Sequence, residues 1–142
     1  MFSIATIEET AYFYARHVPF SGAPLAFSTR LWEYPWVYLQ MRKLGVVPPA
    51  RILDVGCASN PFMVGLAKMG YYMTGLDLYA CDDPRNPSPA FGGFDRSLEN
   101  EHLKFCEGSM DSIPIEKEHF DCVICISNSW NFCIQILLFT YF

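Results

Sequence analysis

The segment from Arg51 to Asp77 constrains the fold more than any other part of the chain. Residues 51–55 form a short apolar run that predicts a strand, and a glycine turn follows it. Asn60 is placed to cap a helix over 62–69, and residues 71–76 read as a second strand that leads to Asp77. A strand, a helix and a strand within so few residues predict a right-handed βαβ unit with two parallel strands.

Further elements flank this unit on both sides. Residues 103–107 and 120–126 predict a third and a fourth strand, and the fourth has the near-continuous hydrophobicity of a buried parallel strand. Helices are expected over 7–17 and 35–44, the second one beginning at its proline and followed by a glycine. The sequence therefore predicts an α/β domain that is preceded by a helical cap.

Composition narrows the class of protein. The chain has 142 residues, a net charge of −5 and 51% hydrophobic residues, which suits one domain and offers no clustered basic footprint for nucleic acid. Its six cysteines are not spaced as a disulfide framework and no signal peptide precedes them, so we expect free thiols in the cytoplasm. Residues 122–142 carry no charge, but the polar run 127–131 interrupts them, so we expect no membrane span.

The turn after the first strand carries the chemistry. It joins a strand end to a helix start, where backbone N–H groups are free and the helix dipole is positive. Gly56 lets a ligand approach the backbone closely, and Ala58 is small enough to keep some of that access. Asp77, at the end of the next strand, can accept hydrogen bonds from two ribose hydroxyls. This pattern predicts an adenosine-containing cofactor, although an ordinary βα turn has the same local features.

Two later motifs specify the cofactor. Residues 107–114, Glu-Gly-Ser-Met-Asp-Ser-Ile-Pro, follow the third strand, and Phe120-Asp121 opens the fourth. Together with Leu-Asp-Val-Gly-Cys at 53–57 and the acid Asp77, this ordered set resembles the class I S-adenosylmethionine-dependent methyltransferases over roughly residues 51–127. An NAD-dependent or nucleotide-sugar Rossmann enzyme is an alternative, but only the first glycine of the three-glycine fingerprint is present.

The resemblance implies a Rossmann-like three-layer sandwich with a partial parallel sheet in the order 3-2-1-4. It divides the chain into an N-terminal helical cap (1–50), a core that binds S-adenosyl-L-methionine (51–127) and an atypical apolar tail (128–142). The cofactor-binding residues that it implies are Asp54, Gly56, Ala58, Asp77, Leu78, Met110, Asp111 and Ser127.

Each of these positions takes a role from the resemblance. Asp54 would organise the turn and the methionine amino group, while Gly56 and Ala58 would pass beneath the methionine and ribose. Asp77 would bind the ribose hydroxyls, and Leu78 follows it in the sequence. The adenine would lie by Met110, with its amino group on Asp111, and Ser127 would lie near the reactive methyl. Glycines are common in this family where Ala58 and Asn60 stand here, which predicts a moderate affinity.

The resemblance ends after Ser127, and the motifs of a seven-stranded sheet do not continue into the tail. We therefore expect a truncated domain whose exposed sheet edge favours self-association. None of His17, His102 and His119 is placed as a general base, no metal site is expected, and the acceptor, a small molecule or another group, cannot be named. A non-catalytic or remnant cofactor-binding domain is the alternative function.

Overall fold

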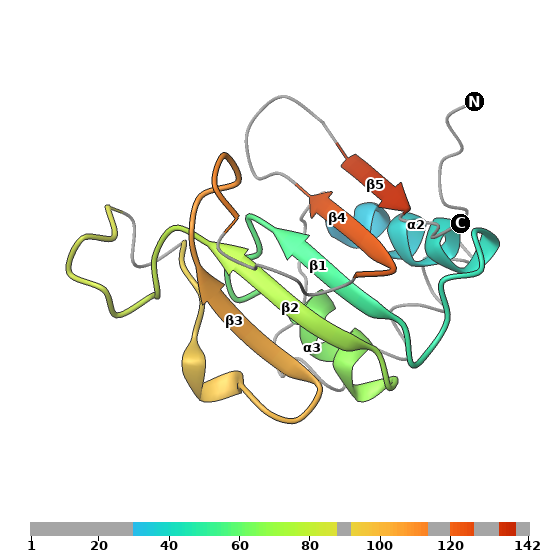
Figure 1. Ribbon diagram of the computed structural model, residues 1–142, viewed down its shortest axis with the longest axis horizontal. Helices are drawn as coiled ribbons and strands as arrows, with labels where there is room; N and C mark the ends of the chain where they lie inside the picture. Colours follow the sequence, from blue (N-terminus) through green and yellow to red (C-terminus); the bar gives the residue numbers. More distant parts are fainter. Residues whose placement is uncertain (1–29, 88–91, 114–119, 127–133, 139–142) are drawn as a thin grey trace.

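The computed structural model describes residues 30–87, 92–113, 120–126 and 134–138, which form one five-stranded sheet in the order β3-β2-β1-β4-β5 (Figure 1). The strands are β1 (Arg51–Val55), β2 (Tyr72–Asp77), β3 (Leu103–Glu107), β4 (Cys122–Ile126) and β5 (Ile134–Leu138). The first four strands are parallel to one another. The predicted α/β, Rossmann-like fold and its 3-2-1-4 order are therefore confirmed.

The fifth strand corrects the prediction for the tail. β5 pairs antiparallel with β4, with Ile136 opposite Ile124, where the sequence indicated neither helix nor strand. An antiparallel neighbour needs no crossover helix, so the punctuation expected of a βαβ unit is missing there. The other residues of the tail, Ser127 and the helix predicted over 7–17 all lie outside the described residues.

Helix α2 (Arg30–Lys43) begins five residues before the predicted start, so the placement of Pro35 at the first helical position was wrong. Proline lacks one N–H and is tolerated near a helix start, and here it lies inside the helix. The predicted end is confirmed: Gly45 has a φ of +79°, and the N–H of Val46 donates to the Met41 carbonyl oxygen at 2.9 Å. This is the hydrogen-bond pattern of a Schellman motif.

Helix α3 (Pro61–Lys68) follows the sequence prediction closely. The Asn60 side chain accepts a hydrogen bond from the Met63 N–H at 2.9 Å, which is the predicted N-cap. Gly70, with a φ of +95°, ends the turn that leads into β2. The cap and the end of the helix in the βαβ unit therefore agree with the predictions from the local sequence.

Both described helices pack on one face of the sheet and lie behind it in Figure 1. Tyr34 of α2 stacks on Phe62 of α3 with ring centroids 4.9 Å apart, which joins the two helices within one core. On the opposite face a smaller apolar cluster is formed by Leu53, Val55 and Leu76. No described helix covers that face, so the second helical layer of the predicted sandwich does not lie among the described residues. Within the same residues, no helix has the length and apolar character needed to cross a bilayer.

Candidate functional site

The turn between β1 and α3 has an unusual backbone. Gly56 and Ala58 have φ values of +71° and +45°, so two of three consecutive residues are left-handed. The N–H groups of Gly56 and Cys57 both donate to the Leu76 carbonyl oxygen, at 2.8 and 3.2 Å. The left-handed conformation suits glycine, whereas at an alanine it costs about 1 kcal/mol. The turn is thus pinned to the end of β2 with some backbone strain at Ala58.

Asp54 organises this turn from below. Its side chain is only 1% exposed, and its carboxylate accepts a hydrogen bond from the Asn60 side-chain amide at 3.0 Å. The same Asn60 amide donates to the Cys57 carbonyl oxygen at 2.8 Å. Asn60 therefore joins the strand end, the turn and the helix start.

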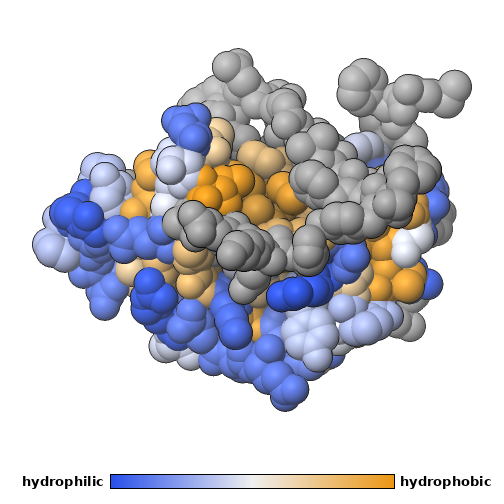
Figure 2. Space-filling model, viewed as in Figure 1, coloured by the Kyte–Doolittle hydropathy of each residue, from blue (hydrophilic) through white to orange (hydrophobic). Residues whose placement is uncertain are grey.

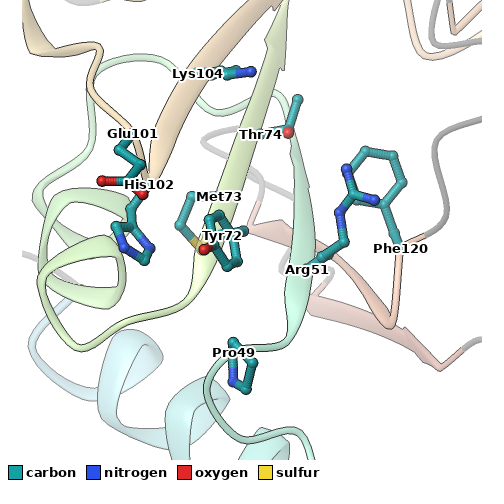
Figure 3. A pocket seen from close by; sticks show the side chains of 9 residues that line it. All are labelled: Pro49, Arg51, Tyr72, Met73, Thr74, Glu101, His102, Lys104 and Phe120. Atoms are coloured by element: carbon teal, nitrogen blue, oxygen red, sulfur yellow. The ribbon is translucent and has the colours of Figure 1, made fainter.

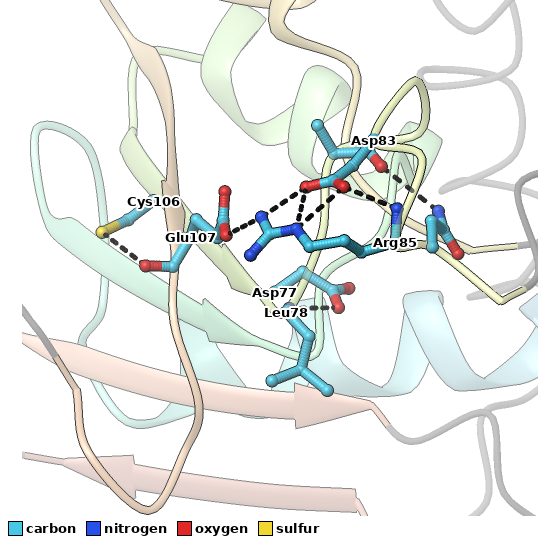
Figure 4. Close-up of polar contacts among 8 residues, drawn as sticks. Asp77, Leu78, Asp83, Arg85, Cys106 and Glu107 are labelled. Carbon is cyan, nitrogen blue, oxygen red and sulfur yellow. Dashed lines mark hydrogen bonds and ion pairs between the residues drawn. The ribbon is translucent and has the colours of Figure 1, made fainter.

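Asp77 lies at the end of β2 and is fixed through both of its carboxylate oxygens. Oδ2 accepts a hydrogen bond from the Ala58 N–H at 2.7 Å. Oδ1 accepts one from the Leu78 N–H, also at 2.7 Å (Figure 4). A carboxylate has about four acceptor positions, so further acceptor capacity remains on the same oxygens. Ala58, which has the left-handed conformation, thus links the turn to Asp77 through its own N–H.

Gly75 allows the turn to approach β2, and the sequence reading gave it no role. A β-carbon at this position would lie 2.6 Å from the Cys57 Sγ and 2.8 Å from atoms of Met63 and Phe105. A glycine inside a strand is the available sequence signal for such an approach. Burial raises the pKa of the Cys57 thiol, and the nearby Asp54 and Asp77 raise it further, so this cysteine is a neutral packing group.

A crevice of about 140 Å³ opens between the carboxyl ends of β1, β2 and β3. It is lined by Val55, Gly56, Leu76, Asp77, Leu78, Gly108, Ser109 and Met110. The large apolar side chains of Leu78 and Met110 are 52% and 63% exposed beside it. Figure 2 shows apolar surface around this end of the central strands. The structure therefore brings four predicted residues together here, namely Gly56, Asp77, Leu78 and Met110.

The other predicted site residues stand apart from the crevice lining. Asp111 is exposed in the turn next to Met110, and one of its carboxylate oxygens accepts a hydrogen bond from the Ser109 hydroxyl at 3.5 Å. Ala58 reaches the site through its hydrogen bond to Asp77, and Asp54 lies beneath the turn. Gly108, which the sequence reading did not assign, lines the crevice, and its N–H donates to the Asp77 backbone oxygen at 2.9 Å.

Arg85 forms a second feature that sequence reasoning missed. Its guanidinium contacts Asp83 at 2.5 Å and Glu107, at the end of β3, at 2.6 Å (Figure 4). Hydrogen bonds from Arg85 hold the pKa of the Asp83 carboxyl below its usual range. These bonds fasten the loop after β2 beside the crevice. No sequence pattern predicts the contact with Glu107, because it joins residues 22 positions apart.

A larger cavity, of about 410 Å³, lies at the opposite, amino-terminal ends of the strands (Figure 3). Its walls include Arg51, Lys104 and the stacked rings of Tyr72 and His102, whose centroids are 4.4 Å apart. Open α/β sheets bind ligands outside the carboxyl ends of their strands, so the smaller crevice is the candidate site. In the described part of the chain no His, Cys, Asp and Glu side chains are grouped to hold a metal ion.

The parallel sheet, the glycine turn and the acid at the end of β2 agree with the fold of a class I S-adenosylmethionine-dependent methyltransferase, and the family comparison shows that class. Residues 53–135 match the family model described as a methyltransferase domain. The match spans more than half of the chain, which therefore belongs to this methyltransferase-domain family. A search of curated proteins found none that matches the chain.

Proposed function

We propose that this chain binds S-adenosyl-L-methionine in the crevice at the carboxyl ends of β1 to β3 and transfers its methyl group to an acceptor. The observation that carries the proposal is the position of Asp77. Two backbone N–H groups hold its carboxylate at the edge of the crevice, between the glycine turn and an apolar wall. Family membership supports methyl transfer in general, and the residue roles that follow are our proposal.

The residues present fit the cofactor. The acceptor positions left on Asp77 suit the two ribose hydroxyls, and Leu78 and Met110 offer apolar surface to an adenine ring. At Gly56 a β-carbon would meet no atom within 4 Å, so the backbone faces open space there. Asp54 and Asp77 give the turn a negative character that complements a sulfonium and an amino group.

The cofactor, when bound, supplies an activated methyl and a good leaving group. The protein then has to hold the reactants in line and limit the access of water. Gly56 and Asp77 orient the ligand, while the ion pair of Arg85 with Glu107 fixes the adjoining loop. His102 lines the cavity at the far ends of the strands, so it is not placed to take a proton from an acceptor at the crevice.

Asp77→Ala tests the proposal directly. Loss of a charge-assisted hydrogen bond costs about 1.5–3 kcal/mol, so we expect the affinity for S-adenosylhomocysteine to fall by a factor of about 10 to 150 in isothermal titration calorimetry. Asp82→Ala, at an exposed aspartate in the following loop, is the matched control and should bind as the parent does. An unchanged affinity in Asp77→Ala would refute this site.

A second function, a cofactor-binding domain without turnover, is favoured by the position of His102, which lines the other cavity and not the crevice. Binding of S-adenosylhomocysteine, with no product formed from a broad panel of acceptors, would support this alternative. A titration with NAD separates both from a dinucleotide enzyme, because we expect no NAD binding. The free thiols of Cys57, Cys81 and Cys106 support our proposal that the protein works in the reducing cytoplasm.

A further inference from the structure

The two edge strands of the sheet, β3 and β5, differ in the partners of their outward-facing backbone groups. At the β3 edge, the Phe105 N–H donates to the Glu99 side chain and the Asn100 N–H donates to the Leu103 carbonyl oxygen, both at 2.9 Å. Strand β2 bonds to the backbone of His102. Because the backbone groups of alternate residues in a parallel strand face opposite neighbours, those of Leu103 and Phe105 face away from β2. The chain therefore satisfies two of its own outward groups at this edge.

The β5 edge is arranged otherwise. The Asp121 N–H donates to the Arg51 carbonyl oxygen, so by alternation Cys122, Ile124 and Ile126 turn their backbone groups to β5. The register places these residues opposite Leu138, Ile136 and Ile134. The remaining residues of β5, Gln135 and Leu137, then turn their backbone groups away from the sheet. Among the described residues no strand pairs with that side.

The sequence of β5 identifies the partner that suits this edge. Exposed edge strands are usually protected by lysines, prolines or bulges, and Ile-Gln-Ile-Leu-Leu contains no charged residue and no proline. A strand that pairs with its own copy places identical charges near one another, which disfavours charged sequences. Residues 134–138 avoid this repulsion, since all of the chain from 122 to 142 is uncharged. These features favour a second copy of the same strand.

We propose that two copies of the chain associate through antiparallel pairing of their β5 strands about a two-fold axis at Ile136. This register pairs Gln135 of one copy with Leu137 of the other, so that outward-facing residues meet and both strands overlap over their full length. A two-fold interface of this kind is closed and does not propagate. The crevices at the ends of β1 to β3 take no part in it, so the proposal is independent of the proposed function.

Sedimentation velocity of the full chain over a wide concentration range tests this interface. We expect a dimer for the parent and for Gln40→Lys, which places the same charge on α2. Gln135→Lys should raise the dimer dissociation constant by at least about tenfold, because it brings like charges together. An equimolar mixture of Gln135→Lys and Gln135→Glu should restore the dimer. Gln135→Pro removes an outward N–H, not one that faces β4, and should give a monomer.

Several outcomes would overturn the proposal. A monomeric parent at every concentration excludes the interface, and so does a dimer that Gln135→Lys leaves unchanged. Assemblies that keep growing with concentration exclude a closed two-fold pair. Circular dichroism of each variant reports its folding, and the mixed-charge rescue does not depend on the proline variant. Failure of the mixture to dimerise, with both components folded, would also contradict the pairing.

Discussion

The two ends of the parallel strands carry cavities of very different character. At the larger one, at the amino-terminal ends, the Arg51 N–H donates to the Asp121 side chain at 2.7 Å, and Tyr72 stacks on His102. The smaller one, at the carboxyl ends, combines left-handed backbone at Gly56 with an acid held by the backbone of two separate segments. Volume alone would favour the larger cavity, whereas the position at the carboxyl ends of parallel strands favours the crevice.

The largest effect should come from Gly75, the residue that lets the two sides of the site approach. Gly75→Ala places a β-carbon within 2.6–2.8 Å of three neighbouring side chains and should lower the free energy of unfolding by about 3 kcal/mol. Urea denaturation measures this loss. Thr74→Val changes the adjacent residue, which lines the cavity at the other end, and should change stability by less than about 1 kcal/mol. Equal losses of unfolding free energy in the two variants would contradict the special role of Gly75 in the close approach of the turn to β2.

Asn60→Ala should have the next largest effect, a loss of about 2 kcal/mol of unfolding free energy. The substitution removes the helix cap and a hydrogen bond to the buried Asp54 carboxylate. Asn60→Ser keeps a capping oxygen but cannot reach both partners, so its loss should be intermediate. If serine restored full stability in thermal or urea unfolding, Asn60 would be a cap only and not the link within the turn.

Ala58→Gly should increase stability by about 0.5–1 kcal/mol, because glycine adopts the φ of +45° without strain. The affinity for S-adenosylhomocysteine should not fall, and a rise would show that the alanine methyl crowds the cofactor. Ala67→Gly, inside α3, is the opposite case and should cost about 1 kcal/mol. A destabilised Ala58→Gly variant would mean that the turn is less strained than its φ value indicates.

The smallest effect is expected at the other end of the sheet. His102→Ala removes a ring that stacks on Tyr72 in the larger cavity, and calorimetry should show no change in the affinity for S-adenosylhomocysteine. Urea unfolding of the same variant should show one cooperative transition, which establishes that it is folded. A lower affinity with unchanged stability would show that the two ends of the strands are coupled, or that the cofactor site has been assigned to the wrong end.

Local signals explain what could be predicted from the sequence. The bounds of β1 and β3, the Asn60 cap and the glycines at positions 45 and 70 depend on a few neighbouring residues, and each was found where it was expected. The conjunction of Gly56 with Asp77 was also predictable, because the carboxyl ends of neighbouring parallel strands must adjoin.

The features that were missed depend on distant partners. The contact of Arg85 with Glu107 and the close approach at Gly75 arise only when three strands are assembled. β5 was missed because a short apolar run shows no periodicity that separates a strand from a tail. The early start of α2 has a similar cause, since a proline that suits the first turn also fits slightly further inside a helix.

The two hydrogen bonds on Asp77 have a consequence for the entropy of binding. A side chain that the backbone already holds in one rotamer loses little conformational freedom when a ligand arrives, so more of each new contact contributes to affinity. The same preorganisation makes the position intolerant of asparagine. An amide would point its own N–H groups at either the Ala58 or the Leu78 N–H, because only a carboxylate accepts on both sides.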